Sequence, residues 1–364
     1  MQSLKNMPNR NSETIRTGAR VLAQYAAAYR EPSHARSLFE LAITTGAFVA
    51  LWIAMWLCLS VNYWLTLLLS VPAAGFLVRL FILQHDCGHG AFFKRRAIND
   101  WVGRALGVLT LTPFDVWQRA HTLHHATSGN LDRRGIGDIG TLTTEEYAAR
   151  SRFGRLTYRV YRHPLIMFGL GPAYLFLLQH RVPLGMMCAG WRPWVSAMAT
   201  NAAIAATAVL MMWFVGPSAF LLVDLPVVLL ASSIGVWLFY VQHQFESAYW
   251  ARDGEWDLHE AALRGSSHYD LPPVLRWFTA NIGLHHIHHL CSRIPFYRLP
   301  QVQRDRPELA KISRVSLSQS LRSVSLALWD ERERRLISFR EARTRADAQS
   351  GPAGQSLDCG HHRT

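Results

Sequence analysis

Two long blocks of apolar residues limit the folds that this chain of 364 residues can adopt. The blocks cover residues 39–83 and 194–242, and each is about twice as long as the roughly 20 apolar residues that a helix needs to cross a bilayer. Only 17% of the residues are charged, below the roughly 25% that is usual for soluble domains. The pattern predicts one membrane domain rather than several soluble domains.

A short turn divides each block into two spans. The predicted spans are residues 39–60, 61–83, 194–216 and 220–243, with turns at Val61-Asn62 and Gly216-Pro217-Ser218. Four spans return the chain to the side of the membrane from which it entered. We therefore expect an all-α integral membrane protein, with four transmembrane helices in two hairpins and a helical cap on one face.

The positive charge follows the same division. The formal net charge is +13, and all 38 Lys and Arg residues except Arg79 lie in residues 1–38, 84–193 and 243–364. Cytoplasmic loops of membrane proteins carry such an excess of basic residues. The charge therefore predicts a cytosolic cap and argues against nucleic-acid binding. Arg79 lies about one turn from the inner end of the second span, from where its head group is expected to reach the interface.

The composition of the other segments predicts the domain organisation. Residues 1–37 read as a cytosolic N-terminal segment without the apolar core of a cleavable signal peptide, and residues 38–310 as the membrane domain. Residues 311–349 are predicted to form a cytosolic C-terminal helix. Residues 350–364 are rich in Gly, Ser and Gln, and we expect a disordered tail there.

Histidine residues are concentrated in three clusters close to these spans. The clusters are His85/His89, His121/His124/His125 and His285/His288/His289. Residues i, i+3 and i+4 lie on one face of an α-helix, so each cluster is expected to direct its imidazoles at one point. Burying so many imidazoles without partners would cost free energy, and the repeated spacing therefore predicts a metal centre.

The number of candidate ligands indicates two metal ions. The eight cluster histidines and His243, which ends the fourth span, make nine imidazoles, whereas a structural zinc ion binds four ligands. Imidazole suits zinc, copper, iron and nickel. Carboxylate-bridged di-iron proteins use Glu and Glu-x-x-His motifs, but the only carboxylate inside these clusters is Asp86. We therefore expect a di-metal site that is bound mainly by histidine and held in the cytosolic cap.

Neighbouring residues have competing interpretations. His180 and His163 are alternatives to His243 as the ninth ligand, but neither ends a span, and His286 points about 100° away from His285 on a helix. The candidate cofactor-binding residues, which would orient an imidazole or a metal-bound water, are Asn281, Asp86 and Asp138; Asn130 and Asp132 are further candidates. Each of these polar residues could instead cap a turn.

The five cysteines do not form a recognisable site. None belongs to a CxxC pair and their number is odd, so neither a disulfide framework nor a thiolate zinc site is expected. Cys87, inside the first cluster, is interpreted as a packing residue. The sequence Cys359-Gly-His361-His362 resembles a metal motif but lies in the predicted disordered tail.

The three clusters resemble the histidine boxes of the membrane fatty acid desaturases, which read HxxxH or HxxxxH, HxxHH and HxxHH. The chain fills all eight positions in the same order, within about residues 38–310. The segments HDCGHGAFF, HHATSGNLDRRGIGD and NIGLHHIHHLCSRIPFYRLP are most similar to the bacterial and plastid-type Δ12 (omega-6) acyl-lipid desaturases.

The resemblance implies an enzyme that uses O2 to introduce a cis double bond into an acyl chain. It implies that the eight box histidines are catalytic and that His243 is the ninth metal ligand. The implied cofactors are two Fe ions, with O2 as co-substrate and an external reductant such as ferredoxin or cytochrome b5. The implied partners are a fatty acyl lipid or acyl carrier and a soluble electron-transfer protein. The implied location is a bacterial inner membrane, with the active site facing the cytoplasm.

Two alternatives remain open from the sequence. A hydroxylase or ketolase shares the same histidine boxes, so the boxes do not separate it from a desaturase. A non-catalytic zinc-binding membrane receptor would also place its ligands on one face. Bound zinc without oxygen consumption would favour the receptor.

Overall fold

Four long helices form the apolar part of the molecule. The computed structural model describes residues 10–185 and 189–350, so the predicted tail beyond Ser350 and the Cys359 motif lie outside the described residues. The long helices are α2 (His34–Cys58), α3 (Tyr63–Gly88), α9 (Trp191–Val215) and α10 (Pro217–His243). All four are long and apolar enough to cross a membrane, which confirms the predicted number and order of spans.

Short turns join these helices in pairs. Between α2 and α3, the side chain of Asn62 caps α3 by accepting a hydrogen bond from the Trp64 backbone N–H at 2.9 Å. Between α9 and α10, the single residue Gly216 ends one helix and precedes the next. Its φ of 88° is in the region that side-chain-bearing residues rarely adopt, so glycine is required at this turn.

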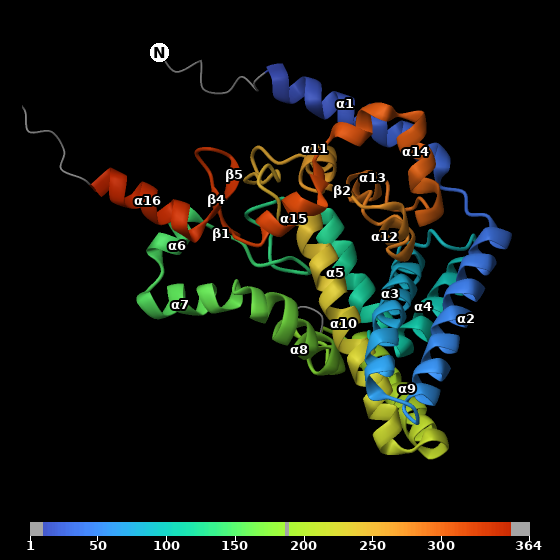
Figure 1. Cartoon of the computed structure of the whole chain (residues 1–364). Helices are drawn as coiled ribbons and strands as arrows, with labels where there is room; N and C mark the ends of the chain where they lie inside the picture. The colour runs from blue at the N-terminus through green and yellow to red at the C-terminus, as the bar shows by residue number, and fades with distance from the viewer. Residues whose placement is uncertain (1–9, 186–188, 351–364) are drawn as a thin grey trace, which may run out of the picture.

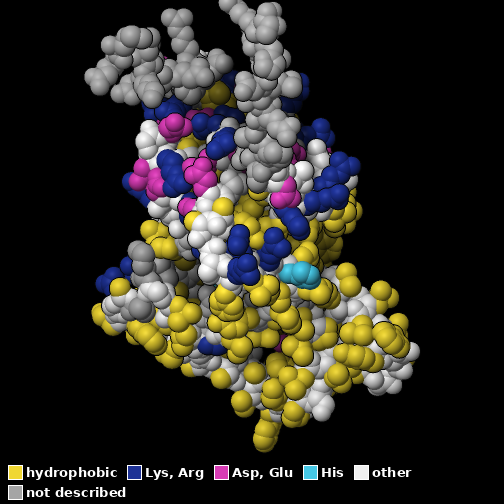
Figure 2. Space-filling view, turned by 90° about the vertical axis from the view of Figure 1, so that its left-hand side faces the viewer, with side chains coloured by type: hydrophobic (Ala, Val, Ile, Leu, Met, Phe, Trp, Pro, Cys, Tyr) yellow, Lys and Arg dark blue, Asp and Glu magenta, His cyan; other side chains and the backbone are white. Residues whose placement is uncertain are grey.

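Shorter helices build the polar part. They are α1 (Arg10–Ala26), α4 (Arg96–Leu109), α5 (Phe114–Thr127), α6 (Thr144–Ala149), α7 (Arg152–Tyr161), α8 (Gly171–Leu177), α11 (Leu258–Arg264), α12 (Pro273–Phe278), α13 (His285–Leu290), α14 (Leu299–Asp305), α15 (Leu317–Ser323) and α16 (Phe339–Ser350). Helices α1, α11, α13 and α14 lie over one end of the long helices, and α7 and α8 extend to the side (Figure 1). On the face shown in Figure 2, hydrophobic side chains cover the lower part and charged side chains gather above them.

The prediction of a helix over residues 311–349 is wrong for much of that segment. Strands β4 (Leu326–Asp330) and β5 (Arg335–Ser338) form an antiparallel hairpin between α15 and α16, and β1 (Leu142–Thr143) pairs with β4 in parallel. A second small sheet pairs β2 (His268–Asp270) with β3 (Arg314–Ser316). The hairpin is favoured because it buries Leu328 and Ile337 against Tyr158, a long-range contact that local charge patterning does not reveal.

Arg79 does not reach the membrane interface as predicted. Its side chain is buried, and its guanidinium group pairs with Glu40 of α2 at 2.5 Å. The same group donates to the Thr44 hydroxyl at 3.2 Å and to the Trp277 carbonyl, and it lies over the Trp277 ring. Because α2 provides the opposite charge, the cation is neutralised within the protein instead of extending to water.

Candidate metal centre

Three short helical segments carry the histidine boxes. Helix α3 continues beyond its apolar part to Gly88, so His85 lies in its last turn and His89 at its C-cap. A Cβ atom on Gly88 would lie 2.8 Å from the Trp117 ring of α5, so glycine allows α3 and α5 to approach closely. The second box lies on α5 and the third on α13.

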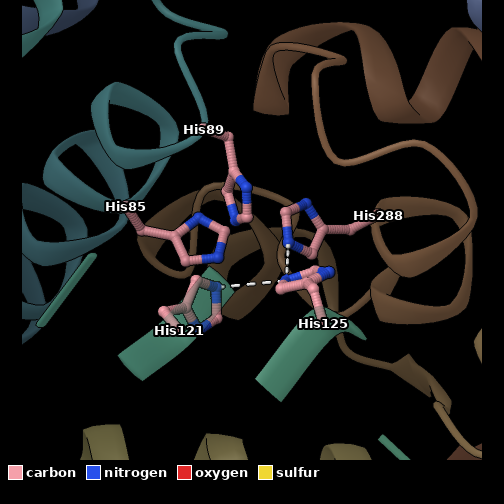
Figure 3. Close-up of side chains that lie close together, drawn as sticks. All are labelled: His85, His89, His121, His125 and His288. Carbon is pink, nitrogen blue, oxygen red and sulfur yellow. Dashed lines mark hydrogen bonds between the residues drawn. The ribbon is translucent and has the colours of Figure 1, made fainter. Parts of the chain in front are cut away.

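The first group of imidazoles combines residues from all three boxes. It consists of His85, His89, His121, His125 and His288, whose ligand nitrogens lie within 4.8 Å of one another. Figure 3 shows the five rings converging from separate segments. The Nε2 atom of His125 lies 3.1 Å from Nε2 of His121 and 3.1 Å from Nε2 of His288.

The second group adds the histidine at the end of α10 to the second and third boxes. It consists of His124, His243, His285 and His289, again with ligand nitrogens within 4.8 Å of one another. Nε2 of His243 lies 3.2 Å from Nε2 of His124 and 3.0 Å from Nε2 of His285. His243 therefore lies among the candidate ligands, and its role as a ligand stays a prediction.

The expectation that each box converges on one point is wrong for the second and third boxes. His121 and His125 belong to the first group, whereas His124 belongs to the second. In the third box, His288 belongs to the first group, whereas His285 and His289 belong to the second. The reason is helical geometry: residues i and i+4 differ by about 40° around the axis, whereas i+3 and i+4 differ by about 100°. Each of these helices therefore supplies imidazoles to both groups.

The nitrogen positions fit two metal ions. Imidazole nitrogen lies about 2.1 Å from an ion such as zinc, so adjacent ligands at a right angle are about 3.0 Å apart. The recorded Nε2–Nε2 distances of 3.0 to 3.2 Å match this spacing. In addition, buried Nε2 atoms of His85 and His89 have no hydrogen-bond partner among the described residues. Such atoms are costly unless they bind a ligand.

The surroundings keep the imidazoles neutral, which is the form that binds metal. Burial, reinforced by the neighbouring imidazoles, lowers the pKa of His121, His125, His288 and His289 well below the usual value for histidine. A neutral imidazole need not lose a proton before it binds an ion. These imidazoles could therefore bind a metal ion at neutral pH without first losing a proton.

Two hydrogen bonds orient rings of the second group. Nδ1 of His124 lies 2.5 Å from the Asp138 carboxylate, and Nδ1 of His243 lies 3.2 Å from the Gly265 carbonyl oxygen. Each contact leaves Nε2 directed at the centre, as in other metal sites where an outer carboxylate or carbonyl fixes the imidazole. The orienting role of Asp138 stays a prediction, and its contact with His124 is the observation that bears on it.

The other polar candidates differ in whether they lie close to an imidazole. Asp86 accepts a hydrogen bond from the Phe296 backbone N–H at 2.7 Å and has a carboxylate oxygen 3.5 Å from Nδ1 of His85. Asn281 precedes α13 at a φ of 55° and donates to the Phe296 carbonyl oxygen at 3.3 Å. Asn130 caps the turn that follows α5, and Asp132 pairs with Arg252 on the surface, so neither contacts an imidazole in the recorded hydrogen bonds.

The alternative histidines lie outside both groups. His286 is buried on the opposite side of α13, where Nε2 is 2.9 Å from the Leu309 carbonyl oxygen. The His180 ring packs edge-on against the Phe176 ring. Nδ1 of His163 accepts a hydrogen bond from the Leu165 backbone N–H. Cys87 is buried in the main apolar core, as its packing interpretation predicted.

The sequence reasoning missed two aromatic residues at the centre. Trp117 stacks on His121, with ring centroids 4.7 Å apart, and Phe239 contacts both His124 and His243. Each lies four residues before a histidine of the same helix, so the i, i+4 spacing was the available signal.

Together, the spans and the two imidazole groups define an integral membrane protein whose polar cap contains two groups of histidines that could each hold a metal ion. A sequence model of the fatty acid desaturase family matches residues 62–319, which include all three boxes. The chain is 45% identical over 328 residues to a protein named fatty acid desaturase from Bacillus subtilis (strain 168), covering 90% of this chain and 93% of that protein. The chain belongs to the fatty acid desaturase family.

More distant relatives have more specific names. The chain is 26% identical over 282 residues to an sn-1 oleoyl-lipid 12-desaturase of Synechocystis sp., covering 71% of this chain and 72% of that protein. It is 28% identical over 238 residues to an sn-1 acyl-lipid omega-3 desaturase (ferredoxin) from the same organism, covering 60% and 61%.

Proposed function

We propose that the protein binds two iron ions and uses O2 to introduce a cis double bond into a fatty acyl chain. The observation that carries the proposal is the division of nine imidazoles into a group of five and a group of four. Iron bound there would supply the oxygen activation and the removal of two hydrogens from adjacent methylenes, with electrons from an external donor.

The residues of this chain would hold and insulate the centre. The eight box histidines and His243 act as ligands in this proposal, and Asp138 keeps the His124 ring in position through its 2.5 Å contact. Trp117 and Phe239 pack against the imidazoles and limit the access of water. Asp86 and Asn281 act indirectly, because both are hydrogen-bonded to Phe296 beside the first and third boxes.

The preferred reaction is Δ12 (omega-6) desaturation of lipid-linked acyl chains at the cytoplasmic face of a bacterial inner membrane. The local similarity of the box segments supports this assignment, as does the name of the oleoyl-lipid relative. The word ferredoxin in the name of another relative supports a small iron–sulfur protein as the electron donor, with cytochrome b5 as the alternative.

Expression in a host that lacks polyunsaturated lipids tests the reaction. We expect mass spectrometry of fatty acid methyl esters to find a cis diene with the new bond at Δ12, and elemental analysis to find about two iron ions per chain. A hydroxylated or keto product would favour the alternative oxidation on the same scaffold. One metal ion per chain, or zinc without oxygen consumption, would reject the di-iron enzyme and favour a zinc-binding receptor.

A further inference from the structure

A pocket of about 260 Å³ lies between α2, α12 and the segment after the third histidine box. We call it the arginine pocket. Its lining includes Arg36 and Glu40 of α2, Arg79 of α3, and Arg276 and Trp277 of α12. None of these residues belongs to the imidazole groups. Three guanidinium groups and one carboxylate therefore share a small space outside the proposed metal centre.

The single carboxylate does not neutralise the arginine pocket. Glu40 divides its two oxygens between the cations, with Arg36 at 2.6 Å and Arg79 at 2.5 Å. Arg79 is buried and fully engaged, whereas the side chain of Arg36 is 54% exposed. Among the described residues, the only ion-pair partner of Arg36 is Glu40, which leaves further N–H donors of Arg36 for a ligand.

Arg276 is the second accessible cation of the pocket. Its nearest carboxylate is Asp270 at 3.5 Å, a long contact, and Asp270 is held more closely by Arg314 at 2.5 Å. The Arg276 side chain is 38% exposed. The pocket therefore carries a formal excess of two positive charges among its lining residues, which favours an anionic ligand.

Exposed apolar side chains border the arginine pocket. Beside it, α12 exposes Val274, Leu275 and Trp277, and α2 exposes Leu38 and Phe39. A short helix with exposed apolar side chains next to arginines is typical of the bilayer–water interface, where tryptophan is also enriched. A ligand at Arg36 and Arg276 would therefore have its anionic group in the polar layer and its apolar part in the bilayer.

We propose that Arg36 and Arg276 bind the phosphate of a membrane phospholipid. The planar guanidinium group matches phosphate through paired hydrogen bonds, and two such groups border one opening here. A lipid is favoured over free phosphate because the side chains beside the opening are apolar and would contact the glycerol and upper acyl region. Arg79, which is ion-paired with Glu40, forms part of the pocket wall between Arg36 and Arg276.

The inner wall of the pocket connects the bound lipid with the metal centre. Phe296 lines the pocket, and its backbone N–H donates to Asp86, the neighbour of His85. Asn281, which also lines the pocket, precedes the third box. A phospholipid held at this opening would then be the acyl carrier, with its chain entering beside the centre. This last step rests on the proposed desaturase function, whereas phosphate binding does not.

Binding of matched lipids tests the site without turnover. The iron-loaded full chain is mixed with dioleoyl phosphatidylglycerol or with an uncharged monogalactosyl diacylglycerol carrying the same chains, and complexes are counted by native mass spectrometry. We expect about tenfold tighter binding of the phospholipid, because a hydrogen bond to a charged group contributes about one decade of affinity. Arg36→Gln and Arg276→Gln should each reduce this preference, and the double variant should bring it to about one.

Arg152→Gln is the matched control, because Arg152 is an exposed arginine of α7 that does not line the pocket. It should keep the full preference. Equal binding of both lipids by the unmodified protein, or an unchanged preference in the double variant, would overturn the proposal. Competition by millimolar inorganic phosphate that displaces the phospholipid completely would overturn the lipid assignment. If Arg36→Gln folds poorly because Glu40 loses a partner, Arg276→Gln decides the test alone.

Kinetics with the same two lipids test the acyl-carrier role. Arg276→Gln should raise KM for the phospholipid about tenfold, leave kcat unchanged and leave the uncharged lipid unaffected. An unchanged KM together with a lost binding preference would overturn the carrier role. Absence of product and iron from the unmodified protein would instead reject the proposed function, while the binding preference would still decide whether the phosphate site exists.

Discussion

The residue that most sharply tests the metal centre is His243, because it lies outside the three boxes. Its Nδ1 contacts the Gly265 carbonyl oxygen, and its Nε2 lies 3.0 Å from Nε2 of His285. His286 is a useful contrast, since it is also buried but points to Leu309 instead of the centre. A comparison of variants at His243 and His286 therefore distinguishes an imidazole that binds metal from one that is only buried.

We predict that His243→Ala abolishes desaturation and lowers bound iron while the protein remains folded. Loss of an outer-shell contact usually costs about 10–100-fold in metal affinity or activity, so loss of a ligand should cost more than that. His286→Ala is the control and should retain iron and substantial activity. Near-normal product from His243→Ala, measured with elemental analysis of the same preparation, would remove His243 from the ligand set.

His286 also predicts a pH dependence of stability. Burial, together with the nearby His268, lowers the pKa of His286 to about 3, whereas an unfolded histidine titrates near 6.5. Below about pH 6.5 the unfolded chain therefore binds a proton that the folded chain does not, so stability is full above this pH and decreases as pH falls toward 3.

His286→Gln should remove this part of the acid sensitivity. The measurement is the shift in thermal midpoint of iron-loaded protein between pH 7.5 and pH 6.0, which should be smaller in the variant than in the unmodified protein. The exposed His34 offers a matched control, since His34→Gln should leave the shift unchanged. An equal shift in all three proteins would contradict the prediction.

At the scale of elements, the pair formed by Glu40 of α2 and Arg79 of α3 joins the first hairpin to the cap. Both side chains are buried, and Arg79 also donates to the Trp277 carbonyl at the end of α12. Helix α12 leads to the third histidine box. The position of the box therefore depends on a charge buried between two membrane-spanning helices.

We predict that Glu40→Ala lowers the free energy of unfolding by about 3–5 kcal/mol, because it leaves Arg79 buried without its counter-charge. Glu31→Ala, at an exposed glutamate just before α2, should stay within about 0.5 kcal/mol. The comparison is made by denaturant unfolding in detergent. A loss in Glu40→Ala no larger than in Glu31→Ala would mean that the buried pair does not stabilise the fold.

At the scale of the whole molecule, charge and hydropathy divide the protein into two parts. The four long helices carry most of the exposed apolar side chains, and the charged helices and strands gather at one end of them (Figures 1 and 2). The histidine groups lie in that polar end, where α3 and α10 finish. A basic cap on a membrane domain is expected to face the cytosol.

Cysteine labelling of intact cells should confirm this orientation. Cysteines introduced at the exposed positions Arg95, Arg133 and Arg293 should be protected from a membrane-impermeant reagent, in a background with Cys58→Ser. Val61→Cys, in the turn between α2 and α3, should react from outside and is the matched control. Reaction of any cap position from outside would reject the four-span topology.

The local sequence pattern was sufficient to predict the elements whose formation depends only on neighbouring residues. A continuous apolar run of about 20 residues has few stable alternatives to a spanning helix, so the four spans were predictable within a few residues. The C-terminal segment was not, because β4 and β5 are stabilised by burial of Leu328 and Ile337 against distant Tyr158. The charge density of this segment alone predicts a surface helix.

The sequence by itself determined the four spans, the three boxes and the presence of enough imidazoles for two ions, because each depends on spacing within one helix. Only the tertiary structure decided which boxes combine, so that His288 of the third box joins His121 and His125 of the second. It also decided that Glu40 meets Arg79, and that Arg36 and Arg276 border one pocket. These arrangements depend on the packing of helices far apart in the chain, which short-range periodicity does not encode.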